Sequence, residues 1–222
     1  MRLFLAVDLD ESSRIAVAEI ATALRARLDP TLIRGTTWVA PSNLHISLRF
    51  LGWVRDEAAA ALYRAFEEPV QLAPFEIEIG GVGAFPGTGA PRVLWIGVRT
   101  GEALLSALYD EVHTRLTKLQ VLPEARTLEN PKLDALCQVS GLASERRGAR
   151  PWPRSARPFH PHITLARFKP NRMPRRSRLP AWVRESGNRI GPMRVSEITL
   201  FESRLSPSGP TYVSKLRTPL VG

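Results

Sequence analysis

Two short segments of the chain are nearly identical, and each carries one of its four histidines. The first reads HISLRF from His45, and the second reads HITLARF from His162. Successive side chains of an extended strand alternate between its two faces, so an imidazole and the hydroxyl two residues later share a face. His45 would therefore share a face with Ser47, and His162 with Thr164. The repeat predicts two strands that each present an imidazole and a hydroxyl to one site.

Paired histidines are suited to proton transfer, since an imidazole with a pKa near 6.5 can act as an acid or a base at neutral pH. One ring would accept a proton from water while the other donates a proton to a leaving oxygen. Each transfer typically contributes about 10²- to 10⁴-fold in rate, and the two hydroxyls could hydrogen-bond an oxyanion. A phosphodiester needs this combination, and ring strain makes a ribose cyclic phosphate especially suitable. The alternative is two structural histidines on half-buried strands, which the duplication disfavours.

The charge of the chain narrows the class of its partner. Its 31 Lys and Arg residues exceed its 21 Asp and Glu residues, which gives a net charge of +10. Such a protein suits a polyanion, such as nucleic acid, a phosphorylated small molecule or an anionic membrane, and charge alone does not choose among them. A membrane-surface protein is disfavoured because no predicted helix has a strongly cationic face.

The length and the cysteine content of the chain limit the number of domains and the kinds of covalent and metal site it can contain. The 222 residues and 44% hydrophobic content are ordinary for a folded protein of one large or two small domains. A single cysteine, Cys137, excludes an intrachain disulfide and a thiolate-rich metal site. The first nine residues are too short and too polar for a signal peptide or a membrane span. We therefore expect a cytoplasmic protein.

The other two histidines are weaker candidates. His113 is expected on the polar side of a helix, without a catalytic role. His160 shares a strand face with His162, a spacing that can chelate zinc, but no carboxylate or cysteine close in sequence completes a metal site. We expect neither a metal nor another cofactor.

Hydrophobic periodicity predicts strands and helices that alternate in the first part of the chain. The predicted strands cover residues 3–7, 44–51, 75–79, 93–98, the segment from His162, 198–201 and 212–216. The first predicted helix runs from a cap at Asp10 to residue 28. The second begins at a cap at Asp56 and turns Leu62 and Phe66 inward, and the third covers about residues 102–120. The expected buried face of the first helix is Ile15, Ala18, Ala21, Leu24 and Leu28.

Three segments are predicted to lack regular structure. The glycines at 80, 81 and 83, with residues 86–89, are expected to form a turn between two strands. Residues 123–158 contain five prolines and six arginines without periodicity, which predicts an irregular basic insertion. Residues 167–178 contain six Lys or Arg. This segment is either a solvated loop or a loop that guides an anionic substrate to the site.

Several segments around the two repeats resemble a known family. They are RLFLAVDL from Arg2, WV at 38–39, NLHISL and FLG within 43–52, GAFP at 83–86, RVLW at 92–95, FHPHITLAR at 159–167 and the tail around 200–212. Over most of the chain, this pattern resembles the RNA 2',3'-cyclic phosphodiesterases, also called 2'-5' RNA ligases, of the two-histidine phosphoesterase superfamily. A lone His-x-Ser/Thr match is weak, but two within this framework are specific.

The resemblance implies the roles of individual residues. His45 would donate a proton to the leaving 3' oxygen, and His162 would be the base that activates water. Ser47, Thr164 and Arg167 would hold the phosphate. Ser47 stands where the family usually has threonine, which keeps the hydroxyl.

The resemblance also implies a fold and an activity. The fold would be bilobal and α+β, with two antiparallel sheets facing across a central cleft and helices packed outside. It would form a single domain over residues 1–222, with an insertion at about 123–158 that is longer than the family's usual connection. The activity would be hydrolysis of RNA 2',3'-cyclic phosphate ends to a 2'-phosphate, with reversible 2'-5' RNA ligation as a further activity. A non-catalytic RNA-binding module with the same basic cleft is the alternative. The sequence has no leucine-rich exposed seam, so we expect a monomer.

Arg167 and Phe50 follow their histidines by the same offset of five residues. A guanidinium suits a phosphate, but strict alternation would turn Arg167 to the face opposite His162. The role of Arg167 therefore requires a bulge or a strand end. We expect Phe50 to stack on a nucleobase.

Overall fold

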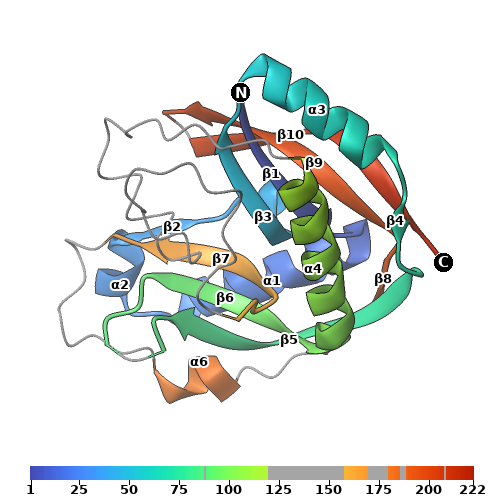
Figure 1. Ribbon diagram of the computed structural model, residues 1–222. Helices are drawn as coiled ribbons and strands as arrows, with labels where there is room; N and C mark the ends of the chain where they lie inside the picture. Colours follow the sequence, from blue (N-terminus) through green and yellow to red (C-terminus); the bar gives the residue numbers. More distant parts are fainter. Residues whose placement is uncertain (88, 120–157, 170–179, 186–188, 208) are drawn as a thin grey trace.

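The structure is a computed structural model that describes residues 1–87, 89–119, 158–169, 180–185, 189–207 and 209–222 (Figure 1). Its strands are β1 (Arg2–Asp8), β2 (Thr36–Trp38), β3 (His45–Trp53), β4 (Val70–Gln71), β5 (Phe75–Phe85), β6 (Val93–Thr100), β7 (His162–Phe168), β8 (Arg189–Val195), β9 (Glu197–Ser206) and β10 (Gly209–Val221). Its helices are α1 (Glu11–Arg27), α2 (Pro30–Arg34), α3 (Asp56–Glu67), α4 (Glu102–Lys118) and α6 (Ala181–Glu185), with a 3₁₀ turn η1 (Pro41–Asn43). The predicted α+β class is confirmed.

The sheet has two halves that meet at one residue pair. The strand order is β4-β10-β9-β1-β3 in the first half and β7-β6-β5-β8 in the second, with β2 also paired to β7. β3 pairs with β7 through Ile46 and Ile163, which are both 0% exposed. Among the described strands, every pairing is antiparallel except that of β4 with β10. The chain thus has two largely antiparallel halves, each with one histidine strand at the shared border. Their union into one domain over residues 1–222 stays a prediction.

The start of α1 agrees with the predicted cap. Asp10 Oδ1 accepts the backbone N–H of Ser13 at 2.8 Å, which satisfies one of the helix's unpaired donors. Arg25 and Arg27 lie in the last turn, where positive charge offsets the helix dipole.

The buried face of α1 agrees with the predicted one at Leu24 and Leu28, which are each 3% exposed, and differs before them. Ile15 is 51% exposed, and the stripe that faces the core is Ser13, Val17, Ile20 and Leu24. This stripe has the same helical spacing, but it buries branched side chains at two positions where the predicted stripe has alanine. Burying the larger apolar area decides the orientation of the helix.

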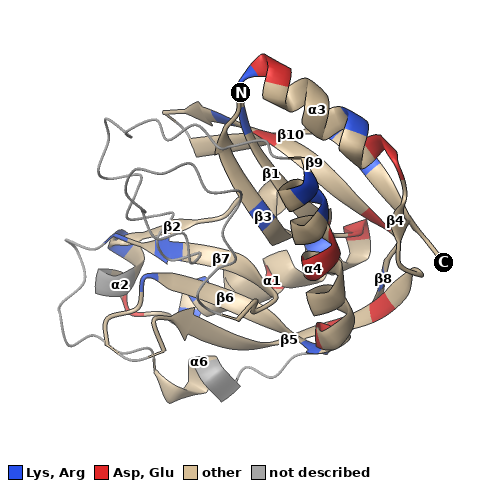
Figure 2. Cartoon of the chain, viewed as in Figure 1, with Lys and Arg blue, Asp and Glu red and all other residues tan. Residues whose placement is uncertain are grey.

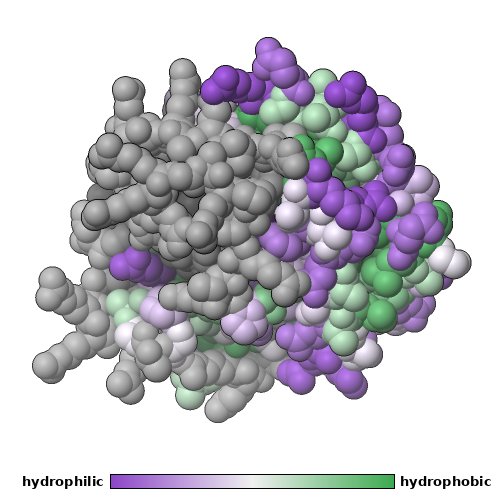
Figure 3. Space-filling view, viewed as in Figure 1, coloured by the Kyte–Doolittle hydropathy of each residue, from purple (hydrophilic) through white to green (hydrophobic). Residues whose placement is uncertain are grey.

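The longer helices lie against the sheet and turn their charged residues outward. α3 packs on β10, α4 on β3 and α1 on β8, while the short α6 packs on β5 (Figure 1). α3 buries Leu62 and Phe66, as predicted, and its outer side has hydrophilic residues with a weakly hydrophobic patch between them (Figure 3). Along α4, acidic residues lie toward the start and basic residues toward the end (Figure 2), which complements the helix dipole.

The glycines between residues 80 and 83 do not form the predicted turn. β5 continues through them to Phe85 and pairs with β6. A Cβ on Gly83 would lie 2.2 Å from the ring of Trp95 on β6. Glycine is required at position 83 because the indole of Trp95 occupies the space that a side chain on β5 would need. The strands β2, β4 and β8 were not predicted.

Two predictions fall largely outside the described residues: the basic insertion at 123–158, and the basic segment at 167–178, of which only residues 167–169 are described. Among the described residues, no helix is long and apolar enough to cross a membrane.

Replacing Gly83 with alanine is expected to lower the free energy of unfolding by about 1–3 kcal/mol, the usual cost of overpacking. The added Cβ would lie 2.2 Å from Trp95, so the ring or the strand must move. Urea denaturation measures the change. Gly87→Ala is a matched control, since nothing lies within 4 Å of a Cβ at that position. Equal stability of the two variants would contradict the close packing of Trp95 on β5.

Candidate active site

The two histidine strands lie side by side at the border between the halves of the sheet. His45 opens β3 and pairs with Asp8 of β1, while His162 opens β7 and pairs with Gly97 of β6. Each histidine is half-buried, and the isoleucine that follows it is fully buried. The predicted alternation is therefore confirmed: the apolar face anchors each strand and the histidine lies on the other face.

β3 contains an extra residue immediately after its histidine motif. Ser47 pairs with Ala6 and Arg49 pairs with Leu5, which leaves Leu48 without a partner on β1. Leu48 and Arg49 are 4% and 5% exposed, so two consecutive side chains are buried. This β-bulge interrupts the alternation of the strand.

β7 contains the same irregularity at the equivalent place. Thr164 pairs with Trp95 and Ala166 pairs with Leu94, which leaves Leu165 without a partner on β6. Leu165 and Ala166 are both 0% exposed. The two histidine strands therefore match in this bulge as well as in their sequences, and β3 has a second bulge at Leu51, between Phe50 and Gly52.

The bulges determine where Phe50 and Arg167 lie. An extra residue shifts the alternation by one, so Arg167 returns to the face of His162 and Phe50 to the face of His45. Both side chains are half-buried, whereas the residues that precede them are buried. The bulge that the role of Arg167 requires is thus present.

Both imidazoles are held in the same orientation. His45 Nδ1–H donates to the carbonyl oxygen of Asn43 at 2.7 Å, and His162 Nδ1–H donates to that of His160 at 2.7 Å. A carbonyl only accepts, so the hydrogen bonds assign the proton of each neutral ring to Nδ1. Nε2 of each ring is then the atom available for chemistry. The Ser47 hydroxyl donates to His45 Nε2 at 2.8 Å.

Aromatic rings surround His45. The ring of Phe4 lies 5.0 Å from the imidazole between centroids, and that of Tyr212 lies 5.3 Å away at 83°. Phe201 stacks on Phe4 with 5.2 Å between their centroids. These rings come from β1, β9 and β10 and exclude water from one side of the imidazole.

A second aromatic group surrounds His162. Phe85 of β5 lies 5.0 Å from the imidazole at 83°, and Trp95 of β6 lies 6.2 Å away. His160 stacks beside His162 at 6.2 Å and 25°. His160 is thus a neighbour of the candidate base, as predicted.

Burial lowers the pKa of both histidines. The pKa of His45 falls to about 4, first because its surroundings desolvate the charged ring, and then because Arg167 and His162 carry like charge. The Asn43 carbonyl and Asp8 oppose this shift. The pKa of His162 is also lowered, chiefly by burial and further by the charges of His160 and Arg167. Both rings are therefore largely neutral at pH 7 when no anion lies beside them.

Arg167 lies within electrostatic reach of three site groups. Its charge lowers the pKa of His45 and of His162. It also opposes the rise in the pKa of Tyr212, which burial causes. A guanidinium that acts on rings from both halves is well placed to meet an anion between them.

Three residues at the site were missed in the sequence. Asn43 holds His45 through its carbonyl, and its Nδ2 donates to the carbonyl of Pro210 on β10 at 2.7 Å. Tyr212 packs on His45, and Arg2 places its Cζ 4.8 Å from the centroid of the Phe50 ring. All three residues belong to segments that resemble the family, but their contacts depend on the pairing of distant strands.

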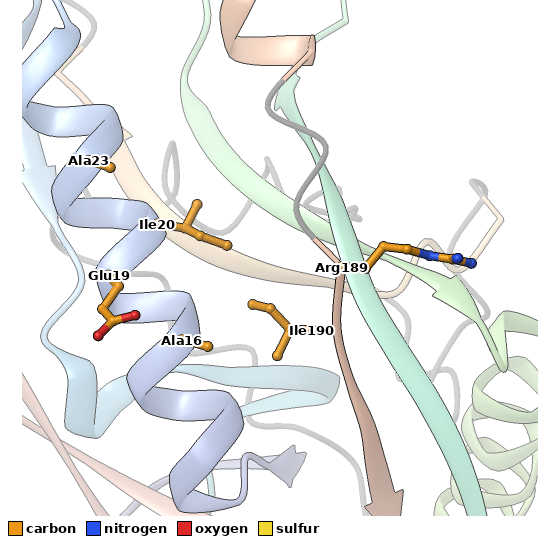
Figure 4. A pocket seen from close by; sticks show the side chains of 6 residues that line it. All are labelled: Ala16, Glu19, Ile20, Ala23, Arg189 and Ile190. Atoms are coloured by element: carbon orange, nitrogen blue, oxygen red, sulfur yellow. The ribbon is translucent and has the colours of Figure 1, made fainter.

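A cavity of about 430 Å³ lies elsewhere, between α1 and β8 (Figure 4). Its lining residues come from these two elements: Ala16, Glu19, Ile20, Ala23, Arg189 and Ile190. It contains no histidine, and Arg189 donates to Glu78 at 3.0 Å. The candidate chemistry is on β3 and β7 instead. Among the described residues, no three His, Cys, Asp or Glu side chains gather as a metal site.

Comparisons with known proteins cover almost the whole chain. The family model described as the 2'-5' RNA ligase superfamily matches residues 12–206. A protein of Archaeoglobus fulgidus named RNA 2',3'-cyclic phosphodiesterase is 34% identical, over 96% of this chain and 96% of its own. A protein of the same name from Methanothermobacter thermautotrophicus is 31% identical, over 96% of this chain and 95% of its own. The crystal structure of TT0787 of Thermus thermophilus has a TM-score of 0.68 and 27% identity, covering 99% of this chain and 98% of that one.

NMR titration of the histidine side chains is expected to give a pKa near 4 for His45, because its ring is desolvated and lies near Arg167. Arg167→Gln should raise that pKa, since it removes a like charge. Added inorganic phosphate should raise it as well, because an anion stabilises the imidazolium. A His45 pKa near 6.5 that neither change moves would contradict the described environment.

Proposed function

Because this chain belongs to the 2'-5' RNA ligase superfamily, we propose that it opens the 2',3'-cyclic phosphate at RNA 3' ends and leaves a 2'-phosphate. The observation that carries the proposal is the matched pair of imidazoles, each with Nδ1 bonded to a backbone carbonyl. Both rings thereby offer Nε2 to a reacting group. The names of the curated relatives favour catalysis over a non-catalytic RNA-binding module.

The reaction needs two opposite proton transfers. A water oxygen attacks phosphorus and gives a proton to His162 Nε2, while the bond from phosphorus to the 3' oxygen breaks. His45 Nε2 donates a proton to that oxygen, which becomes the 3' hydroxyl. Two hydrogen-bonded carbonyls hold the rings in the tautomer that this exchange requires.

The substrate supplies the condition under which His45 becomes an acid. With a pKa of about 4, few His45 rings carry a proton at pH 7. A phosphodiester anion offsets the charge of Arg167 and raises the pKa of the ring beside it. His45 therefore gains a proton when the substrate binds, and its ring is uncharged in the free protein.

The remaining polar groups bind the phosphate. Arg167 supplies a planar, permanently charged donor close to both imidazoles. Ser47 and Thr164 follow the two histidines at the same offset and add a hydroxyl from each half of the sheet. These donors stabilise charge on the non-bridging oxygens as water attacks.

The nucleoside meets the half of the sheet that carries His45. Phe50 lies on the face of that histidine, and the Arg2 guanidinium covers one side of its ring. Arg2 and Phe50 together form a flat cationic surface on which a base can stack. One half of the site thus holds the phosphate through Arg167 while the other holds the base.

The same groups support ligation, in which an RNA 5' hydroxyl takes the place of water in opening the 2',3'-cyclic end and the product is a 2'-5' bond. We place the protein in the cytoplasm, where a lone cysteine is kept reduced, and we expect it to act as a monomer. Sedimentation over a range of concentrations tests the oligomeric state.

The purified protein should open the ring of an oligoribonucleotide with a 2',3'-cyclic phosphate end in excess EDTA, and the product should be a 2'-phosphate. His45→Ala and His162→Ala should each lower kcat by about 10²- to 10⁴-fold, since each removes a proton transfer. Chromatography of the labelled product measures the rate. His113→Gln serves as a histidine control on α4. Undiminished activity in either alanine variant would refute the mechanism.

Ser47→Ala should lower kcat/KM by about tenfold, because it removes one hydrogen bond to a charged group. Ser47→Thr should retain activity, since it keeps the hydroxyl. Steady-state kinetics on the same substrate compare the two. A loss of equal size in both variants would show that the size of the side chain matters and the hydroxyl does not.

A further inference from the structure

The face that carries His45 continues beyond Phe50 to Trp53, which has no role in the reaction, and to its partner Arg2, which also covers the Phe50 ring. Arg2 pairs with Trp53 across β1 and β3. The position of the Arg2 Cζ over the Phe50 ring, 4.8 Å from its centroid, places this pair on the face of the site. His45, Ser47, Phe50 and Trp53 therefore follow one another along one face of β3.

Trp53 is exposed at the end of β3, although nearby apolar residues are buried. It is 47% exposed, whereas its neighbour Val54 and the nearby Leu51 are 5% and 2% exposed. Across the described part of the chain, no aromatic ring or cation lies against its indole. A single exposed aromatic residue is ordinary on a protein surface, but this one continues a surface that already holds a cation and a stacking ring.

Arg2 supplies a positive charge beside Trp53 on the same face, while the nearest acidic residues along the chain, Asp56 and Glu57, lie in the first turn of α3. Glu202 of β9 pairs with Leu3, which faces the core, and its carboxylate is bound to Arg204 at 2.9 Å on that opposite side. Asp8 lies at the other end of the strand, where Arg14 binds it at 2.6 Å. Neither carboxylate cancels the charge of Arg2.

The spacing of the rings fits a single-stranded nucleic acid. Phe50 and Trp53 pair with Phe4 and Arg2, which lie two residues apart on β1, so the two rings are roughly 7 Å apart along the strand at about 3.3 Å per residue. Stacked nucleotides advance by about 3.4 Å and extended ones by more, so the indole lies beyond the reach of the terminal base. A chain whose last base is on Phe50 would bring an earlier base to Trp53.

We propose that Arg2 and Trp53 form a binding site for the nucleotides that precede the cyclic end, so that the preferred substrate is an oligoribonucleotide rather than a mononucleotide. This inference rests on the proposed function, since the cyclic end at the histidines sets the direction of the strand. Trp53 stacks on a base without reading its identity, and Arg2 neutralises a backbone phosphate.

The test compares two substrates with the same cyclic end: a nucleoside 2',3'-cyclic phosphate and a tetranucleotide. The measured quantity is the ratio of kcat/KM for the tetranucleotide to kcat/KM for the nucleoside. Trp53→Ala should lower this ratio by about 5- to 100-fold, the usual effect of losing one stacked base. Trp53→Phe should restore most of it, and Leu104→Ala, at a 42% exposed residue of α4, should leave it unchanged.

A binding experiment makes the result independent of turnover. A labelled tetranucleotide with a 2'-phosphate end should bind Trp53→Ala about 5- to 100-fold more weakly than the wild type. Arg2→Gln should reduce the slope of log affinity against log salt by about 0.7, the value for one phosphate contact on a single strand. If the wild type opens neither substrate but these two effects persist, the proposed reaction fails and the binding site stands.

Several results would overturn the binding site. One is an unchanged ratio in Trp53→Ala, and another is a parallel fall in kcat/KM for both substrates, which indicates a structural role. A third would be that the wild type is a dimer, that Trp53→Ala is a monomer, and that both bind the tetranucleotide equally well. The indole would then contact a second copy of the chain.

Discussion

The pairing of Ile46 with Ile163 is the contact on which the position of both histidines depends. Each isoleucine follows a histidine directly, and each is completely buried. Burying such a side chain contributes about 1.5–3 kcal/mol, so the apolar faces of β3 and β7 are held firmly against the core. Because neighbouring residues point to opposite faces, fixing the isoleucines side by side also fixes where the two imidazoles emerge. The polar site is positioned by apolar packing on its reverse side.

The two bulges add a second constraint. Without the extra residue at Leu165, Arg167 would face the core, where a charge without a partner costs several kcal/mol. The bulge instead places Ala166 in the core and Arg167 on the site face. In β3 the buried position is filled by Arg49, whose guanidinium donates to the Tyr109 hydroxyl at 3.2 Å. β3 therefore has the same backbone irregularity as β7, but it buries Arg49 where β7 buries Ala166.

The sequence predicted the features that depend on local periodicity. Alternation correctly placed each histidine on the face opposite its isoleucine, and the cap at Asp10 was correct because one side chain and one N–H define it. The face of Arg167 was not predictable, since a bulge exists only relative to a partner strand. The glycines of β5 were misread for the same reason, because the ring that requires Gly83 belongs to β6. The contacts of Asn43 with Pro210, and of Arg2 with Phe50, depend on strand order in the same way.

The match between the two strands has a consequence for the direction of the chemistry. Both imidazoles bond through Nδ1 to the carbonyl two residues earlier, and both strands bulge at the fourth residue of the motif. The two halves are thus related by an approximate two-fold axis near Ile46 and Ile163. The attacking and leaving oxygens of an in-line displacement at phosphorus are related by a similar symmetry. Microscopic reversibility exchanges the acid and the base when the reaction runs backward. In a site built this way, neither ring is confined to one role: the ring that accepts a proton when a bond to phosphorus forms donates a proton when that bond breaks.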